Sequence, residues 1–133
     1  MSAWTKIKKK LKSGTWYPFY NTFYEKTRID PYTILLESRS GRGMESNIFA
    51  ILRELNQEEY RKYSIVFACR SDYKASVEKK LQHYGLKVDK LMKFGSISYY
   101  RMLSRAKYLI NDSTFPGRFI KKDGQIYLNV WHG

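Results

Sequence analysis

The chain has 133 residues, of which 43% are hydrophobic and 28% charged, and its formal net charge is +13. This length and composition predict one globular domain with its own core and argue against intrinsic disorder. No apolar run reaches the roughly 20 residues of a transmembrane helix, and the N-terminal apolar stretch is too interrupted for a secretory signal. The single cysteine, Cys69, lies in an apolar run and predicts a small buried residue rather than a nucleophile or half of a disulfide.

The first 14 residues contain five lysines and no acidic residue, and three apolar residues recur among them at helical spacing. The pattern predicts a short basic amphipathic helix over residues 1–14 that lies on an anionic membrane surface, with a solvated tail as the alternative. The candidate membrane-binding residues are Trp4, Lys6, Ile7, Lys8, Lys9, Lys10, Leu11 and Lys12. Because this segment supplies +5, the remaining chain keeps +8 and should itself attract polyanions: nucleic acid, anionic lipid or phosphate-bearing substrates.

Residues 15–30 are predicted as an aromatic helix. Their aromatic residues recur at spacings of three and four: Trp16, Phe19, Tyr20, Phe23 and Tyr24. Such a stripe predicts a helix docked against a core, and the alternative is that it continues the membrane-facing surface.

From residue 31 onward, strand-like apolar runs alternate with helical patterns. Strands are predicted at residues 32–38, 63–69, 86–94 and 107–111 and from residue 126, and helices at 46–55, 73–84 and 96–106. The alternation predicts an α/β fold with a doubly wound parallel sheet and helices on both faces. The residues expected on central, buried strands are Leu35, Val66, Ile110 and Leu128.

Polar residues follow two of the predicted strands where each one ends. The first exit is a basic, glycine-containing loop that leads into a helix, an arrangement that presents backbone N–H groups to an anion. It matches neither a Walker loop nor the full dinucleotide fingerprint. The candidate phosphate- or acceptor-binding residues at the two exits are Arg39, Ser40, Gly41, Arg42, Asn111, Asp112, Ser113 and Thr114. An ordinary surface connection is the alternative for the first loop, and a turn-forming or capping role is the alternative for Asp112.

The chain ends in Trp131-His132-Gly133, so an imidazole directly follows the last predicted strand. Taken by itself, His132 is slightly more typical of a structural residue than of a catalytic one. Together with the earlier run from Asn111 to Pro116, this ending resembles the CDP-glycerol glycerophosphotransferases of teichoic acid synthesis. The resemblance reaches back to about Tyr32.

The resemblance implies that residues 31–133 form a Rossmann-like, acceptor-side domain, the N-terminal half of a glycosyltransferase-B-type fold. A nucleotide-binding domain is then expected to follow Gly133, and this chain alone is expected to be inactive. The resemblance also makes His132 the general base that takes the proton of an acceptor hydroxyl as it attacks the β-phosphate of CDP-glycerol, a task that suits an imidazole at neutral pH. Asp112 is a candidate to orient it.

Further expectations concern ligands and location. The resemblance implies a CDP-glycerol or CDP-ribitol donor, a lipid-linked teichoic acid acceptor and a peripheral place at the cytoplasmic face of the cell membrane. No cofactor is expected, and without an Asp-x-Asp pair or a His/Cys cluster no metal site is predicted. The residues do not separate glycerol from ribitol phosphate, or a primase from a polymerase.

Two other classes of function remain open. The charge and the 12 tyrosines permit a basic nucleic-acid-binding domain, although none of the known RNA- or DNA-binding motifs occurs and no nucleic-acid partner is expected. The other alternative is a non-catalytic membrane-surface adaptor, in which His132 has no chemical role.

Overall fold

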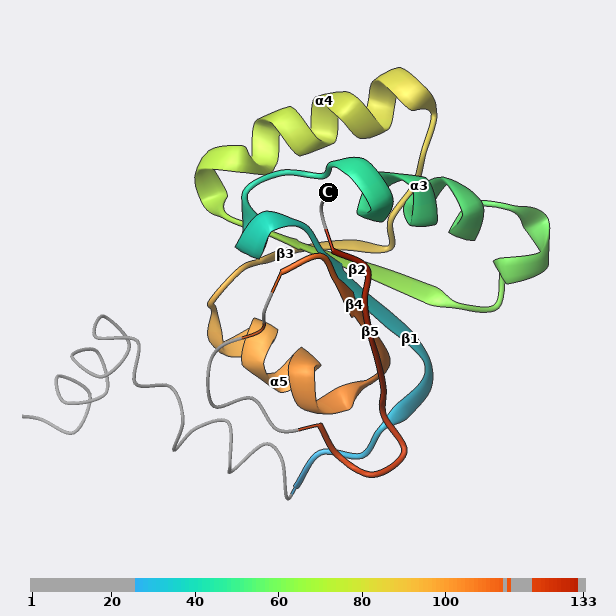
Figure 1. Ribbon diagram of the computed structural model, residues 1–133, viewed down its shortest axis with the longest axis vertical. Helices are drawn as coiled ribbons and strands as arrows, with labels where there is room; N and C mark the ends of the chain where they lie inside the picture. The colour runs from blue at the N-terminus through green and yellow to red at the C-terminus, as the bar shows by residue number, and fades with distance from the viewer. Residues whose placement is uncertain (1–25, 114, 116–120, 132–133) are drawn as a thin grey trace, which may run out of the picture.

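The computed structural model describes residues 26–113, 115 and 121–131. Its centre is a five-stranded sheet whose strands are β1 (Asp30–Glu37), β2 (Ser64–Cys69), β3 (Lys90–Lys93), β4 (Ala106–Asn111) and β5 (Ile126–Asn129). Every pairing is parallel, and the order is β3-β2-β1-β4-β5 (Figure 1). The predicted parallel α/β fold is therefore confirmed. The strand order reverses between β1 and β4, which is the position where doubly wound sheets bind their ligands.

Helices cover both faces of the sheet. Helices α3 (Ser46–Leu55) and α4 (Lys74–Tyr84) lie on one face, and α5 (Ile97–Arg105) lies on the other (Figure 1). The short 3-10 turns η1 (Arg39–Gly41), η2 (Glu58–Tyr60) and η3 (Ser71–Tyr73) complete the connections. Gly85 ends α4 at a φ of +64°, and the Ser96 hydroxyl caps α5 by accepting a hydrogen bond from the Tyr99 N–H. Both helix boundaries agree with the predicted ones.

The hydrophobic core has two layers, one on each face of the sheet. Leu35 and Val66 face α5, whereas Leu36 and Phe67 face α3 and α4. Residues 34–36 of β1 and 65–69 of β2 are buried on both faces of the sheet, and each of these stretches is a continuous apolar run. Cys69 belongs to the α3/α4 layer and is buried, as predicted.

Three expectations about the elements need correction. Leu128 is 48% exposed, because β5 is the edge strand, and Ile110 is only partly buried. The third strand begins at Lys90 instead of residue 86. The helix predicted over residues 15–30 cannot include residues 27–30, since residues 27–29 are not helical and Asp30 already belongs to β1. Pro31 favours this extended conformation, because a proline disfavours the helical region for the residue before it. The aromatic stripe from Trp16 to Tyr24 lies outside the described residues.

Candidate functional site

The loops after β1 and β4 meet at the carboxyl edge of the sheet. One carboxylate oxygen of Asp112 accepts a hydrogen bond from the Ser38 hydroxyl at 2.9 Å, and the other accepts one from the Arg39 N–H at 2.7 Å. The Ser40 N–H donates to the Ser113 hydroxyl at 3.2 Å. These contacts span more than 70 positions of sequence and bring two predicted groups of site residues together at the switch point. Asp112 is fully buried, and its two hydrogen bonds connect the loop after β4 to the loop after β1.

The backbone N–H groups of four consecutive residues in the first loop, Arg39 to Arg42, already donate hydrogen bonds within the protein. Arg39 and Ser40 donate to the second loop, while Gly41 and Arg42 donate to the Ser38 carbonyl at 2.9 and 3.1 Å. These four N–H groups of the predicted anion-binding loop are therefore not free for a ligand. What the loop offers instead is two guanidinium groups: Arg39 and Arg42 are exposed, and neither forms an ion pair with another described residue.

Gly41 has a specific structural reason to be a glycine. Its φ is +85°, and a Cβ built on it would lie 2.8 Å from Cγ of Phe94, the residue that follows β3. Arg70, which follows β2, holds the same turn. Its N–H donates to the Gly41 carbonyl at 2.7 Å, its Nε donates to the Ser40 carbonyl at 2.9 Å, and its guanidinium lies over the Phe94 ring. Arg70 is not among the predicted site residues, although its place directly after a strand-like run was a usable signal.

A buried polar layer lies beneath the loops on the α5 side of the sheet. Glu37, the last residue of β1, is fully buried and accepts a hydrogen bond from the Tyr99 hydroxyl of α5. Asn111, the last residue of β4, accepts one from the Tyr127 hydroxyl at 2.7 Å. Burial raises the pKa of Glu37 to about 8, with a smaller contribution from the charge of Asp112. Asn111 is a predicted site residue that lies in this layer rather than at the surface.

The chain also approaches its C-terminal end at this edge. The Val130 N–H donates to the Asn111 carbonyl at 2.8 Å, and the Asn47 side chain of α3 donates to the carbonyls of Val130 and Trp131, both at 2.8 Å. The chain up to Trp131 is therefore attached beside the two loops. His132 itself lies outside the described residues, as do Thr114 and the whole segment 1–14.

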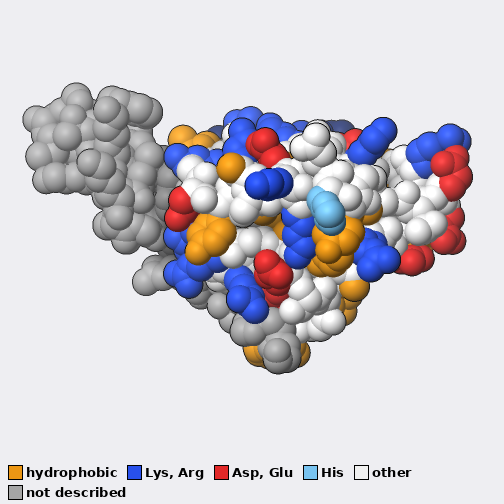
Figure 2. All heavy atoms as spheres, turned by 90° about the horizontal axis from the view of Figure 1, so that it is seen from above, with side chains coloured by type: hydrophobic (Ala, Val, Ile, Leu, Met, Phe, Trp, Pro, Cys, Tyr) orange, Lys and Arg blue, Asp and Glu red, His pale blue; other side chains and the backbone are white. Residues whose placement is uncertain are grey.

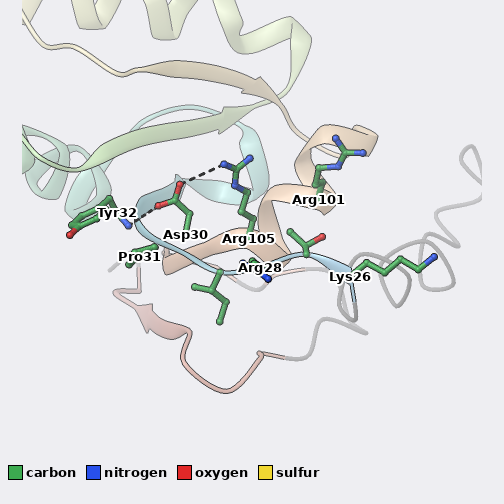
Figure 3. Close-up of a pocket in the computed structure, with 9 residues that line it drawn as sticks. Lys26, Arg28, Asp30, Pro31, Tyr32, Arg101 and Arg105 are labelled. Atoms are coloured by element: carbon green, nitrogen blue, oxygen red, sulfur yellow. Dashed lines mark hydrogen bonds and ion pairs between the residues drawn. The ribbon is translucent and has the colours of Figure 1, made fainter.

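A separate basic hollow of about 770 Å³ lies around the start of β1 (Figure 3). Its lining residues are Lys26, Thr27, Arg28, Ile29, Asp30, Pro31, Tyr32, Arg101 and Arg105. Arg105 forms an ion pair with Asp30 at 3.7 Å. With four cationic side chains and one carboxylate, the lining favours anions.

Two further features bear on the predicted ligands. Within the part of the chain that the structure describes, no three His, Cys, Asp or Glu side chains gather in a way that could hold a metal ion. In the same residues, no helix has both the length and the apolar character needed to cross a bilayer.

The comparisons with known proteins agree with the fold. The chain is 25% identical over 114 residues to the teichoic acid poly(glycerol phosphate) polymerase of Staphylococcus epidermidis (strain ATCC 35984), covering 86% of this chain and 15% of that protein. Its structure is similar to that of a variant of the wall teichoic acid polymerase TagF soaked with CDPG, at a TM-score of 0.70 and 20% identity over 97% of this chain and 29% of that one. Another structure of the wall teichoic acid polymerase TagF gives a TM-score of 0.65 at 18% identity, over 100% of this chain and 32% of that one.

The structural likeness establishes the fold, which matches the predicted Rossmann-like half of a glycosyltransferase-B-type enzyme. The chain spans only about a seventh of the curated relative and about a third of the TagF structures. The sequence model of the CDP-glycerol:poly(glycerophosphate) glycerophosphotransferase family matches residues 19–133, and this chain belongs to that family.

Proposed function

We propose that this chain is the acceptor-side part of an enzyme that transfers glycerol phosphate, or ribitol phosphate, from a CDP-activated donor to a lipid-linked teichoic acid. The observation that carries the proposal is the junction of the loops after β1 and β4 by Asp112 at the switch point, with the chain before His132 attached beside it. In open α/β sheets this crevice is where ligands bind. Family membership supplies the class of reaction.

His132 is the proposed general base. It would accept the proton of the acceptor hydroxyl as that oxygen attacks the β-phosphate of the donor, and CMP would leave. An imidazole has an unperturbed pKa of about 6.5, so it can accept a proton near neutral pH. The direct attachment of Val130 and Trp131 to Asn111 and Asn47 supports this role, because it brings the preceding backbone to the carboxyl edge.

Arg39 and Arg42 are the proposed phosphate-binding groups of this half. Phosphoryl transfer places negative charge on the transferred group, and fixed cations offset it. Since the backbone N–H groups of residues 39–42 already donate within the protein, the guanidinium groups would carry this task. Their charge is not cancelled by any ion pair with a described carboxylate. The donor nucleotide would be held mainly by residues outside this chain.

We also propose that the protein is peripheral and binds an anionic membrane surface at the cytoplasmic face. The five lysines of residues 1–14 carry this proposal, and the basic hollow around Arg28 and Arg101 at the start of β1 adds further cationic side chains. Each such charge near an anionic leaflet contributes roughly 1 kcal/mol. Lys and Arg side chains are spread over the α3/α4 side of the molecule rather than gathered in one groove (Figure 2), which argues against a defined duplex-binding cleft on that side.

The test of the proposed function is a transfer assay with the full-length protein. Purified enzyme would receive labelled CDP-glycerol or CDP-ribitol and a lipid-linked teichoic acid primer. Transfer that depends on Arg39 and Arg42 but not on Lys79 of the α4 surface supports the site. The proposal fails if neither donor is used, or if Arg39→Ala/Arg42→Ala transfers as fast as Lys79→Ala.

A further inference from the structure

Two polar side chains meet at the end of the central strands without satisfying each other. Glu37 and Asn111 are register partners on β1 and β4, and both are fully buried on the α5 side of the sheet. One oxygen of Glu37 accepts from Tyr99, and the amide oxygen of Asn111 accepts from Tyr127. The second carboxyl oxygen, Oε2, and the amide nitrogen, Nδ2, have no hydrogen-bond partner among the described residues.

Two buried polar atoms without hydrogen-bond partners are energetically unfavourable. An unsatisfied buried polar group costs about 1–3 kcal/mol, and an ionised carboxylate without a full set of partners costs more. The groups facing Glu37 come from three elements: Tyr99 and Tyr100 of α5, Asp112 after β4 and Arg70 after β2. Burial is the largest influence and raises the pKa of Glu37 to about 8, while the Tyr99 hydrogen bond and the charge of Arg70 lower it. The carboxyl thus carries its proton at neutral pH.

A neutral carboxyl and an amide are complementary to one water molecule. Buried waters typically make about three hydrogen bonds to otherwise unsatisfied polar groups. A water between the two strand ends would accept one hydrogen bond from Asn111 Nδ2 and one from the protonated Oε2 of Glu37. Together with the hydrogen bonds from Tyr99 to Glu37 and from Tyr127 to Asn111, such a water would complete a chain of hydrogen bonds from α5 through both strand ends to β5.

We propose that Glu37 is a positioning residue of the acceptor site: its neutral carboxyl, joined to Asn111 through one internal water, keeps the ends of β1 and β4 aligned and so fixes the loops that carry Arg39 and Asp112. Ionisation of Glu37 would place a second buried negative charge beside Asp112, which already accepts two hydrogen bonds from the first loop. The loops would then separate and the proposed acceptor site would lose its geometry. The activity part of this inference rests on the proposed function; the protonation and alignment parts do not.

The first experiment needs no activity. In this chain, the side-chain carboxyl carbon of Glu37 would be followed by NMR between pH 4 and pH 10, together with the backbone amide of Arg39, which donates to Asp112. We expect Glu37 to titrate near pH 8 and the Arg39 amide to shift in the same step. In Glu37→Gln the Arg39 step should vanish. In Tyr99→Phe it should move to higher pH, because the Tyr99 hydrogen bond lowers the pKa of Glu37. A Glu37 titration near 4.5, or an Arg39 amide indifferent to it, overturns the inference.

The second experiment uses the full-length enzyme. With the wild type, kcat/KM for the acceptor should fall about tenfold per pH unit once Glu37 ionises, whereas Glu37→Gln should stay within about threefold of its plateau up to pH 9.5. Glu54→Gln, on the α3 surface, controls for loss of an acidic residue and should keep the wild-type profile. A profile unchanged in Glu37→Gln overturns the positioning role, and absence of transfer by every variant, with the NMR result intact, overturns the proposed function alone.

Discussion

The carboxylate of Asp112 and the hydroxyl of Ser38 lie 2.9 Å apart across 74 positions of sequence, and this contact joins the ends of the two central strands. Both groups are fully buried, so no water competes for the hydrogen bond. The second oxygen of the carboxylate accepts from the Arg39 N–H. The basic loop after β1 is therefore held in place by one buried acidic side chain, Asp112.

Replacing Asp112 should destabilise the fold as well as the site. Asp112→Ala removes both acceptors and leaves the Ser38 hydroxyl and the Arg39 N–H unsatisfied. Hydrogen bonds to charged groups contribute about 1.5–3 kcal/mol each, so the free energy of unfolding should fall by about 3–5 kcal/mol. Urea denaturation would measure this change. Asp123→Ala, in an exposed turn, is the control and should change stability by less than about 0.5 kcal/mol. If the free energy of unfolding fell no further in Asp112→Ala than in the control, the hydrogen bonds of Asp112 would not contribute to stability.

Substitution of Gly41 should separate backbone strain from steric overlap. Gly41→Ala places a Cβ 2.8 Å from Phe94 at a φ of +85°, whereas Gly85→Ala has a φ of +64° and nothing within 4 Å. Gly85→Ala should lose about 1 kcal/mol from the left-handed conformation alone. Gly41→Ala should lose at least about 1–2 kcal/mol more, because overpacking of a core contact adds to the strain. Thermal denaturation of both variants side by side gives the difference. Equal losses would show that Phe94 moves aside freely.

The stability of the protein should depend on pH through Glu37. Its pKa is raised from 4.5 in the unfolded chain to about 8 in the fold, so between these values the folded state binds more protons than the unfolded state. Stability is therefore fully present below pH 4.5 and is lost as pH rises through 8, by up to about 1.4 kcal/mol per pH unit. Denaturation series at pH 6, 7, 8 and 9 should show this decline in the wild type and a flatter curve in Glu37→Gln. Parallel curves for the two proteins would contradict it.

The sequence predicted the order and type of the elements well, because each strand has a clear local signal. The runs that contain Leu35 and Val66 are apolar throughout, as strands buried on both faces must be. The prediction failed for Leu128, since an alternating pattern does not tell whether a strand lies at the edge of its sheet. The order of the elements along the chain does not show that α3 and α4 leave the Leu128 side chain about half exposed.

The candidate site was predicted in position but not in detail. Strand ends indicated where the loops would meet, yet the partners of their N–H groups, Asp112 and Ser113, lie 73 positions away. No local sequence pattern could show that these acceptors bind N–H groups that the sequence predicts to be free for an anion. Glu37 was missed for a similar reason: in sequence it is an acidic residue before a polar loop, and only the fold places it under Tyr99.

Membrane binding should depend on the N-terminal segment first and on the basic hollow second. Deletion of residues 1–14, or replacement of their five lysines by glutamine, should release the protein from phosphatidylglycerol vesicles. Arg28→Gln/Arg101→Gln should weaken binding by a smaller factor, and Lys74→Gln/Lys79→Gln on α4 is the matched control. Because exposed charges are screened, raising the salt concentration should weaken binding in every case. Sedimentation with anionic and neutral vesicles measures these differences; equal binding to both, unaffected by the deletion, would exclude the electrostatic mechanism. Tight, salt-sensitive binding to duplex DNA would instead favour the nucleic-acid alternative.

The catalytic prediction concerns His132 in the full-length protein. His132→Ala should lower kcat by roughly two to four orders of magnitude, the usual range for loss of a general base. Donor affinity should change little, since the base acts on the acceptor hydroxyl and its loss is felt mainly in the transition state. His83→Ala, on the exposed surface of α4, is the matched control and should retain full activity.

The chain of 133 residues alone should bind CDP-glycerol weakly and show no turnover, because the nucleotide is expected to be held by residues outside it. Calorimetric titration of this chain and of the full-length protein with the same CDP-glycerol stock would measure that difference. Comparable affinity in the two would place donor-binding residues within the present chain, where Arg39, Arg42 and Arg70 are the first candidates to replace.

Steady-state rates within a few-fold of the wild type for both His132→Ala and His132→Gln would remove the imidazole from the reaction. The remaining explanation for its position would then be structural, and the acceptor hydroxyl would need another base at the same carboxyl edge.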